Sequence, residues 1–108
     1  MIETSSYYAV IFTSKLSENT IDYHETAEKI ETLAKQQPGY LGIASARDHI
    51  GITVSYWESL EAIHNWKQQI THLEVQQKGR NIWYDWYDIK ICKVERAYEF
   101  NSKNNLSL

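Results

Sequence analysis

The chain has 108 residues, 43% of them hydrophobic, which is enough for one domain with an apolar core. Its net charge of −3 and its pI near 5.8 argue against nucleic acid and anionic membranes as partners, and we see neither a bilayer-spanning apolar run nor a signal peptide. Cys92 is the only cysteine, which excludes an intrachain disulfide or a cysteine-based metal cluster and favours a cytoplasmic location.

The first third of the chain predicts a strand and then a helix. Tyr7 to Thr13 is rich in aromatic and β-branched residues, as strands are. Ser17 to Thr20 follow and offer candidates for a helix N-cap. Apolar residues then recur at helical spacing and predict an amphipathic helix over Asp22 to Gln36. Pro38-Gly39 ends this helix, because proline lacks an N–H donor and glycine accepts a positive φ. The expected buried stripe is Tyr23, Ala27, Ile30 and Leu33, with Ala34 beside it.

The rest of the chain predicts a hairpin, a second helix and a closing strand. Tyr40 to Arg47 and Gly51 to Trp57 are strand-like, and the short connection between them indicates a hairpin. Ser59 is a good N-cap for the second helix, which we expect to end near Gly79. Trp83 to Phe100 indicates one long strand or a bent pair of strands. Residues 1–100 therefore form the expected single domain, and residues 101–108 a frayed tail. The expected buried stripe of the second helix is Leu60, Ile63, Trp66 (or Lys67) and Ile70.

This order of elements is that of the ferredoxin-like α+β fold, βαββαβ, a four-stranded antiparallel sheet with helices on one face. A sheet with one face in water alternates apolar with polar residues, but the first strand is apolar on both faces. The closing strand shows the same pattern, with Tyr87, Ile89 and Ile91 opposite Trp86, Cys92 and Val94. Burying a second face of about 600 Å² is worth on the order of 15 kcal/mol before entropy costs. We therefore expect a homodimer formed by sheet-to-sheet packing.

The types and spacing of certain residues along the chain resemble the pattern of the antibiotic biosynthesis monooxygenase family. The resemblance covers the chain from the first strand to about Phe100. It implies a dimeric α/β barrel, in which two ferredoxin-like sheets pack face to face. Members similar to this chain include cofactor-free quinone-forming oxygenases acting on polycyclic phenols, and haem-degrading monooxygenases. The residues that carry the resemblance are Pro38-Gly39-Tyr40, Trp57-Glu58-Ser59, Trp66, His72, Gly79-Arg80, Trp83-Tyr84, Tyr87 and Val94-Glu95-Arg96-Ala97-Tyr98.

The haem-degrading branch fits this sequence only in part. That branch has an asparagine on the first strand, a tryptophan on the second helix and a haem-ligating histidine ten residues after it. Trp66 matches the tryptophan. The first strand contains no asparagine, and Gln76 stands where the histidine would be, one helical turn after His72. We therefore place haem binding and haem degradation second to an activity without a prosthetic group.

The quinone-forming branch implies a pocket for a planar aromatic ligand, lined by Trp66, His72, Trp83 and Tyr56. His72 is the candidate general base, since its ordinary pKa lies near neutrality. Arg80 or the indole N–H of Trp66 is the candidate for stabilising the phenolate that forms. Asn65, next to Trp66, is a candidate substrate-binding residue by the same resemblance, although it points about 100° away around the helix.

Three functions follow as alternatives. The first is a small monooxygenase that oxidises an aromatic or quinone-like metabolite without a prosthetic group. The second is a haem-binding or haem-degrading monooxygenase. The third is a non-enzymatic dimer that binds a small aromatic molecule. Each candidate residue also has a purely structural interpretation: Trp66 as core, His72 as a surface histidine, and Arg80 as a charge at a helix end.

Overall fold

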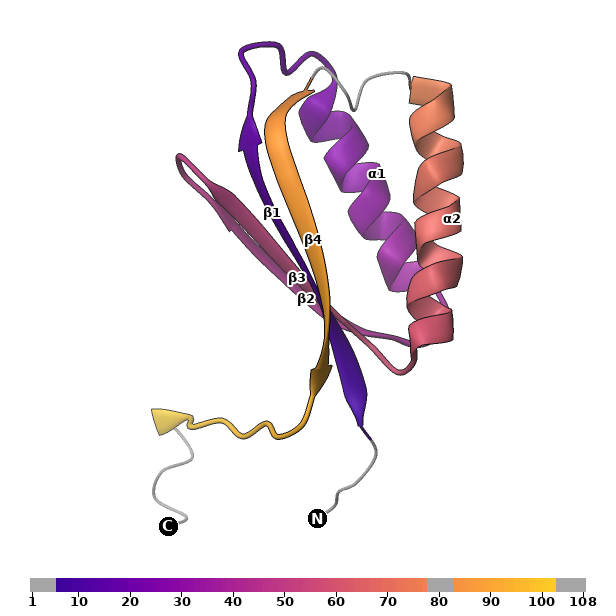
Figure 1. The fold of residues 1–108 in the computed structure, drawn as a ribbon, viewed down its shortest axis with the longest axis vertical. Helices are drawn as coiled ribbons and strands as arrows, with labels where there is room; N and C mark the ends of the chain where they lie inside the picture. The colour runs from indigo at the N-terminus through magenta and orange to yellow at the C-terminus, as the bar shows by residue number, and fades with distance from the viewer. Residues whose placement is uncertain (1–5, 78–82, 103–108) are drawn as a thin grey trace.

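The computed structural model describes residues 6–77 and 83–102, and its elements follow the predicted order (Figure 1). The four strands form one antiparallel sheet in the order β2-β3-β1-β4. Both helices lie side by side on the same side of the sheet (Figure 1). The ferredoxin-like α+β fold is therefore confirmed. Its elements are β1 (Tyr7–Leu16), α1 (Tyr23–Gln36), β2 (Tyr40–Arg47), β3 (Gly51–Trp57), α2 (Leu60–Gln77) and β4 (Tyr84–Val94).

β2 and β3 begin and end where predicted, but β1 and β4 differ. β1 continues to Leu16 because β4 pairs with it along its whole length, from Tyr7 opposite Val94 to Leu16 opposite Tyr84. β4 ends at Val94, short of the predicted Phe100, where it pairs with the first residue of β1. The predicted helix end at Gly79 and most of the predicted frayed tail lie outside the described residues.

The start of α1 differs from the prediction that a residue between Ser17 and Thr20 caps it. Asp22 precedes the helix in the left-handed region, with a φ of 64°, and makes no side-chain cap hydrogen bond. The Ser17 hydroxyl stabilises a turn before the helix, where it accepts a hydrogen bond from the Asn19 N–H at 3.1 Å. The α1 stripe is also displaced: Thr26 and Ala34 are buried, whereas Ala27 and Leu33 are half-buried. Small side chains therefore line the helix where it approaches its neighbours.

The start of α2 is as predicted. The Ser59 hydroxyl accepts a hydrogen bond from the Ala62 N–H at 3.0 Å, which is an N-cap. Gly39, in the turn after α1, has a φ of 89°, and a Cβ placed on it would lie 2.7 Å from the Ala62 Cβ. Its carbonyl accepts a hydrogen bond from the Glu58 N–H at 2.8 Å. Only glycine combines that backbone with that close approach, so the turn holds β2 against the first turn of α2.

Strand register assigns each side chain to one face of the sheet. The helix face, which looks toward α1 and α2, includes Tyr8, Val10, Phe12 and Ser14 of β1. The open face looks the other way and includes Tyr7, Ile11, Val54, Tyr56, Ile52, Trp86 and Cys92. Ile52 and Trp86 are 47% and 43% exposed there. Both faces thus carry apolar side chains, as predicted. The two helices lie on one of them (Figure 1), where Tyr87, Ile89 and Ile91 of β4 remain 45%, 44% and 50% exposed.

The core lies between the helices and the sheet, toward the end of the sheet where β3 finishes. Within the described residues, no helix is long and apolar enough to cross a membrane. Leu60, predicted in the α2 stripe, is exposed because it begins the helix, and Ala62 is buried instead. The buried cluster consists of Val10, Ala34, Trp57, Ala62, Ile63 and Trp66.

Candidate functional site

Two tryptophans stack at one end of the helix face, which we call the tryptophan end (Val10, Ala34, Trp57, Ala62, Ile63 and Trp66). Trp57 is the last residue of β3 and is fully buried. Trp66 comes from the inner side of α2 and is 8% exposed. The two ring centroids lie 4.7 Å apart with an interplanar angle of 27°. This stack packs α2 against the end of β3 as part of the buried core.

The N–H groups of the two indoles differ in their hydrogen bonding. The Trp57 Nε1–H donates to the Ser55 hydroxyl at 2.9 Å, and that serine is buried on the same strand. The Trp66 Nε1 is also buried but has no hydrogen-bond partner among the described residues. A buried donor left unpaired costs about 1–3 kcal/mol. Native proteins leave few such groups, so each one calls for an explanation, such as a bound water or a catalytic role. The Trp66 N–H is the donor of this stack that lacks a hydrogen-bond partner among the described residues.

A second group of rings lies around the start of α1 and of β4. Phe12 on β1 lies 5.5 Å from the ring of Tyr87 and 5.6 Å from that of Tyr84. Tyr23, the first residue of α1, makes edge contacts with Tyr84 at 5.9 Å and with Trp83 at 5.8 Å. These rings continue the aromatic lining of the helix face away from the tryptophan end.

Trp83, predicted to bind substrate, is buried among these rings and has a structural role. Its Nε1–H donates to the Ile21 carbonyl at 2.7 Å, and its own carbonyl accepts the Ser17 N–H at 2.6 Å. Both bonds hold the β1–α1 loop to the start of β4. A ligand could therefore meet the Trp83 ring, but its N–H is already satisfied.

The other predicted residues of α2 do not join Trp66. His72 and Asn65 are both exposed on α2. Six residues of helix place His72 about 120° around the axis from Trp66, so within one chain the candidate base and the buried indole face different ways. Arg80 lies outside the described residues.

Tyr56, the remaining predicted pocket residue, lies on the other side of the sheet. It pairs with Ala9 on β1, and its ring contacts that of Tyr7 at 6.0 Å. Both tyrosines belong to the open face, because neighbouring Trp57 points to the helices and successive strand residues alternate. Tyr56 therefore does not line the space beside Trp66 within one chain.

Sequence reasoning missed a polar group at the opposite end of the helix face. There, Arg47 at the end of β2 donates a hydrogen bond to the hydroxyl of the fully buried Ser14 on β1. The two residues are far apart in the sequence, and β3 separates their strands. The signal that could have found them is register: with both strands paired to β3, Arg47 and Ser14 each lie opposite Gly51.

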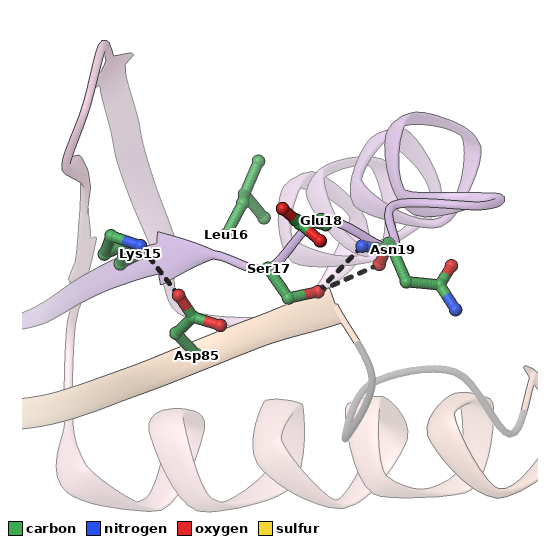
Figure 2. A pocket seen from close by; sticks show the side chains of 6 residues that line it. All are labelled: Lys15, Leu16, Ser17, Glu18, Asn19 and Asp85. Atoms are coloured by element: carbon green, nitrogen blue, oxygen red, sulfur yellow. Dashed lines mark hydrogen bonds and ion pairs between the residues drawn. The ribbon is translucent and has the colours of Figure 1, made fainter.

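Two shallow depressions lie near the β1–α1 loop, and neither is lined by Trp66 or His72. In the one shown in Figure 2, Lys15 forms an ion pair with Asp85 at 2.7 Å and Ser17 bonds to the Asn19 backbone. The groups in it satisfy one another, so we assign it no ligand. Within residues 6–77 and 83–102, no three His, Cys, Asp or Glu side chains gather as a metal site would require.

Comparisons with known proteins agree with this fold. No family model matches the chain. The Bacillus subtilis (strain 168) protein YqjZ, itself uncharacterized, is 48% identical over 101 residues, which cover 92% of this chain and 89% of YqjZ. Solved structures named as putative antibiotic biosynthesis monooxygenases, from Nitrosomonas europaea and Bacillus cereus, have the same fold, with TM-scores of 0.67 and 0.60 at 10% and 18% identity.

Two of the solved structures bear on cofactor use. SnoaB, a cofactor-independent oxygenase from Streptomyces nogalater, superposes with a TM-score of 0.67 at 9% identity, covering 87% of this chain and 97% of SnoaB. A variant of MhuD with two manganese protoporphyrin IX molecules bound per active site superposes with a TM-score of 0.65 at 17% identity, covering 86% and 99% of the two chains. At these identities the likeness establishes the fold alone.

Proposed function

We propose that this chain, which belongs to the same family as Bacillus subtilis YqjZ and has the fold of the antibiotic biosynthesis monooxygenases, is a small monooxygenase that oxidises a planar aromatic metabolite without a prosthetic group. The observation that carries the proposal is the buried, unpartnered Nε1 of Trp66, set in an aromatic layer between the helices and the sheet. A cytoplasmic location remains the prediction made from the single cysteine.

The aromatic layer suits a flat, electron-rich ligand. Fused rings gain from stacking against indole and phenol faces and from the exclusion of water. Once such a ligand has lost a proton, its oxyanion needs a donor, and the buried Trp66 N–H can supply one where no water competes. A single preorganised donor of this kind typically contributes about 10²–10³-fold in rate. Trp66 would thus both hold the ring and stabilise the charge that develops on it.

The reaction balances without an added reductant. A base removes a proton from an activated CH₂ group of a polycyclic phenol, and the resulting carbanion passes electrons to O₂. The carbon gains one oxygen atom as a carbonyl group, and its two hydrogens leave with the second oxygen atom as water. The substrate supplies all four electrons, so the protein needs only to bind, deprotonate and stabilise it. His72 remains the predicted base, and its exposed position in the single chain means that a bound ligand or a second subunit must reach it.

Haem does not fit the residues present. All four histidines, namely His24, His49, His64 and His72, are exposed, so none is placed between the helices and the sheet as an axial ligand. β1 holds no asparagine, and Gln76 stands at the tenth position after Trp66. We therefore derive no step through haem, and the proposed activity uses the substrate's own electrons.

We also propose that a second copy of the chain covers the open face and gives a homodimer. Apolar side chains there, including Ile52 and Trp86, are 47% and 43% exposed in the single chain. A contiguous exposed apolar face of this kind marks an interaction surface, and a face shared by two identical sheets gives a two-fold interface. An Ile52→Glu variant should sediment as a monomer at micromolar concentration where the parent chain sediments as a dimer. The matched control is Leu60→Glu, which places a charge at an exposed leucine of α2. A parent chain that is monomeric would remove the dimer.

The test of the activity uses 1,8-dihydroxy-9-anthrone, a polycyclic phenol with an activated CH₂ group, in aerated buffer. We expect formation of the quinone above the uncatalysed rate, read by its absorbance, with about one O₂ consumed per quinone. Trp66→Phe keeps an aromatic ring but removes the N–H, and should lower kcat about 10²-fold or more. His64→Ala, an exposed histidine on the same helix, is the control and should leave kcat unchanged.

Three further outcomes test the base assignment and the alternative functions. His72→Ala with unchanged turnover would refute the base assignment while leaving the oxygenase intact. Binding of the phenol that depends on Trp66, with no quinone formed above background, would instead favour a non-enzymatic ligand-binding dimer. A ligated Soret band on addition of haemin would support the haem alternative against the proposal.

A further inference from the structure

The opposite end of the helix face is built around one arginine, and we call it the arginine end (Ser14, Tyr23, Arg47 and Gly51). Arg47 is the last residue of β2, and its side chain crosses over β3 to reach β1. Its Nη2 donates to the Ser14 hydroxyl and its Nη1 to the Ser14 carbonyl at 3.4 Å. Its Cζ lies 5.9 Å from the centre of the Tyr23 ring on α1. The guanidinium is therefore held on the helix face by two strands and a helix.

Gly51 lies beneath the Arg47 side chain and leaves room for it. A Cβ built on Gly51 would overlap Cζ, Nη2 and Nε of Arg47, which are the three atoms nearest to it. The backbone of Gly51 has no positive φ that would itself require glycine. What the missing side chain provides here is room for the guanidinium to lie flat across the sheet.

The charge of Arg47 is not neutralised by this setting. In the part of the chain that the structure describes, no carboxylate lies within ion-pair distance of Arg47, and the ion pairs there all involve lysines. A guanidinium carries five N–H donors in a fixed fork, and Ser14 accepts from two of its nitrogens. Arg47 itself is exposed, at the edge of the space between the helices and the sheet. An oriented cation with donors to spare and no counter-ion is the arrangement that binds carboxylates and other oxyanions.

The arginine end faces the same space as the tryptophan end. Gly51 and Trp57 begin and end β3, and both lie on the helix face. They are about 20 Å apart along the strand. Arg47 contacts Ser14 at the level of Gly51, and Trp66 stacks on Trp57 at the other end. The Phe12 ring lies between these two levels and contacts the rings of Tyr87, which pairs with Ser14 at the level of Arg47, and of Tyr84, which lies just beyond it. A ligand stacked on these rings would bring one end toward Arg47.

We propose that Arg47 is a specificity-determining residue, which binds the acidic group of an elongated aromatic acid while its rings occupy the layer between the helices and the sheet. This inference rests on the proposed function, since it names the class of substrate for that same layer. The ligand's oxyanion takes the place of the missing counter-ion, and Tyr23 holds the cation in place through its ring face.

The test compares two fluorescent probes that differ chiefly in charge. 1-Anilinonaphthalene-8-sulfonate and N-phenyl-1-naphthylamine share one ring system, and only the first carries an anionic group. Fluorescence titrations give both dissociation constants. Arg47→Met should weaken binding of the sulfonate about tenfold and leave that of the neutral probe within about twofold, since one charge-assisted pair at a partly exposed site is worth about 1.4 kcal/mol. Arg47→Lys keeps the charge but loses the fork, and should fall between the parent and Arg47→Met.

A second variant keeps Arg47 but displaces its side chain. Gly51→Ala puts a methyl group where the guanidinium now lies, so Arg47 must swing away without loss of charge. It should weaken sulfonate binding about as much as Arg47→Met does, while its melting temperature shows that the sheet is intact. Arg96→Met removes an exposed arginine from the segment after β4 and is the charge-matched control. It should change neither probe.

The outcomes separate this inference from the proposed function. If Trp66→Ala, which removes the ring, weakens the neutral probe but Arg47→Met and Gly51→Ala leave the sulfonate unaffected, the layer binds ligands and Arg47 only links two strands. Equal loss for both probes in the Arg47 variants also overturns the inference. If neither probe binds in a way that depends on Trp66, the layer is no ligand site, and both proposals fail.

Discussion

The tryptophan end and the arginine end belong to the same face of the sheet, but they use their side chains differently. At the tryptophan end the rings of Trp57 and Trp66 fill the space between α2 and the sheet, and Trp57 is completely buried. At the arginine end a charged side chain spans from β2 to β1 and stays exposed. The β2–β3 hairpin there leans away from the helices, whereas at the tryptophan end the chain closes against α2 (Figure 1).

We expect the tryptophan end to determine stability and the arginine end to determine ligand recognition. Apolar burial contributes about 25 cal/mol per Å² removed from water, so the tryptophan end supplies much of the folding free energy. Exposed polar contacts contribute little, because water competes for them. Changes at the tryptophan end should therefore act on unfolding, and changes at the arginine end should act on binding.

The largest effect is expected from Trp57→Ala. The substitution removes a fully buried ring, its stack on Trp66 and its bond to Ser55, and should cost about 3–5 kcal/mol of unfolding free energy. Urea denaturation measures it. Tyr98→Ala, at an aromatic residue that is 89% exposed, should change stability by less than about 0.5 kcal/mol. Similar losses for both variants would mean that the tryptophan end is not the centre of stability.

A gain of about 1 kcal/mol is expected from Thr26→Val. Thr26 lies one turn into α1, is 1% exposed, and its hydroxyl has no partner among the described residues. Valine has nearly the same shape and removes an unsatisfied polar group, which costs about 1–3 kcal/mol when buried. The matched control is Thr32→Val on the exposed side of α1, which should be close to neutral. A loss of stability in Thr26→Val would show that the hydroxyl has a partner, such as a bound water, that it needs.

The smallest effect is expected from Lys15→Ala near the arginine end. Its ion pair with Asp85 is short, at 2.7 Å, but the two side chains are 34% and 49% exposed. Exposed pairs of this kind contribute about 0.2–1 kcal/mol and are screened by salt. Thermal melts at low and high salt should show a small loss that shrinks as salt is added. A salt-independent loss above about 2 kcal/mol would contradict the contrast between the two ends.

Much of the fold was predictable because its signals are local. The bounds of β2 and β3 followed from strand-forming runs broken by a three-residue connection, and the Ser59 cap followed from its place before a helical stripe. The extent of α1 was predicted to within one residue, but its cap was not, because Asp22 adopts a left-handed backbone that no cap pattern indicates. The extent of β1 and β4 depended on where each strand ran out of a partner.

The candidate site was predictable only in part. Trp66 stood out because it is a large aromatic residue at core spacing on α2, and it proved to be buried against Trp57. Tyr56 looked equally suitable from its neighbourhood in the sequence, but strand alternation turns it to the open face, away from Trp66. His72 lies close to Trp66 along the chain, yet helical rotation leaves it exposed.

The order of the elements, the ferredoxin-like fold and the apolar residues on both sheet faces followed from local sequence patterns, because hydrophobic period and turn chemistry act over a few residues. Which polar groups meet depended on how the whole chain packs. Arg47 reaches Ser14 because two registers place both opposite Gly51. The Trp57 N–H finds the Ser55 hydroxyl, whereas the Trp66 N–H has no partner among the described residues. Such pairings depend on strand register and helix rotation, which arise when the whole chain packs.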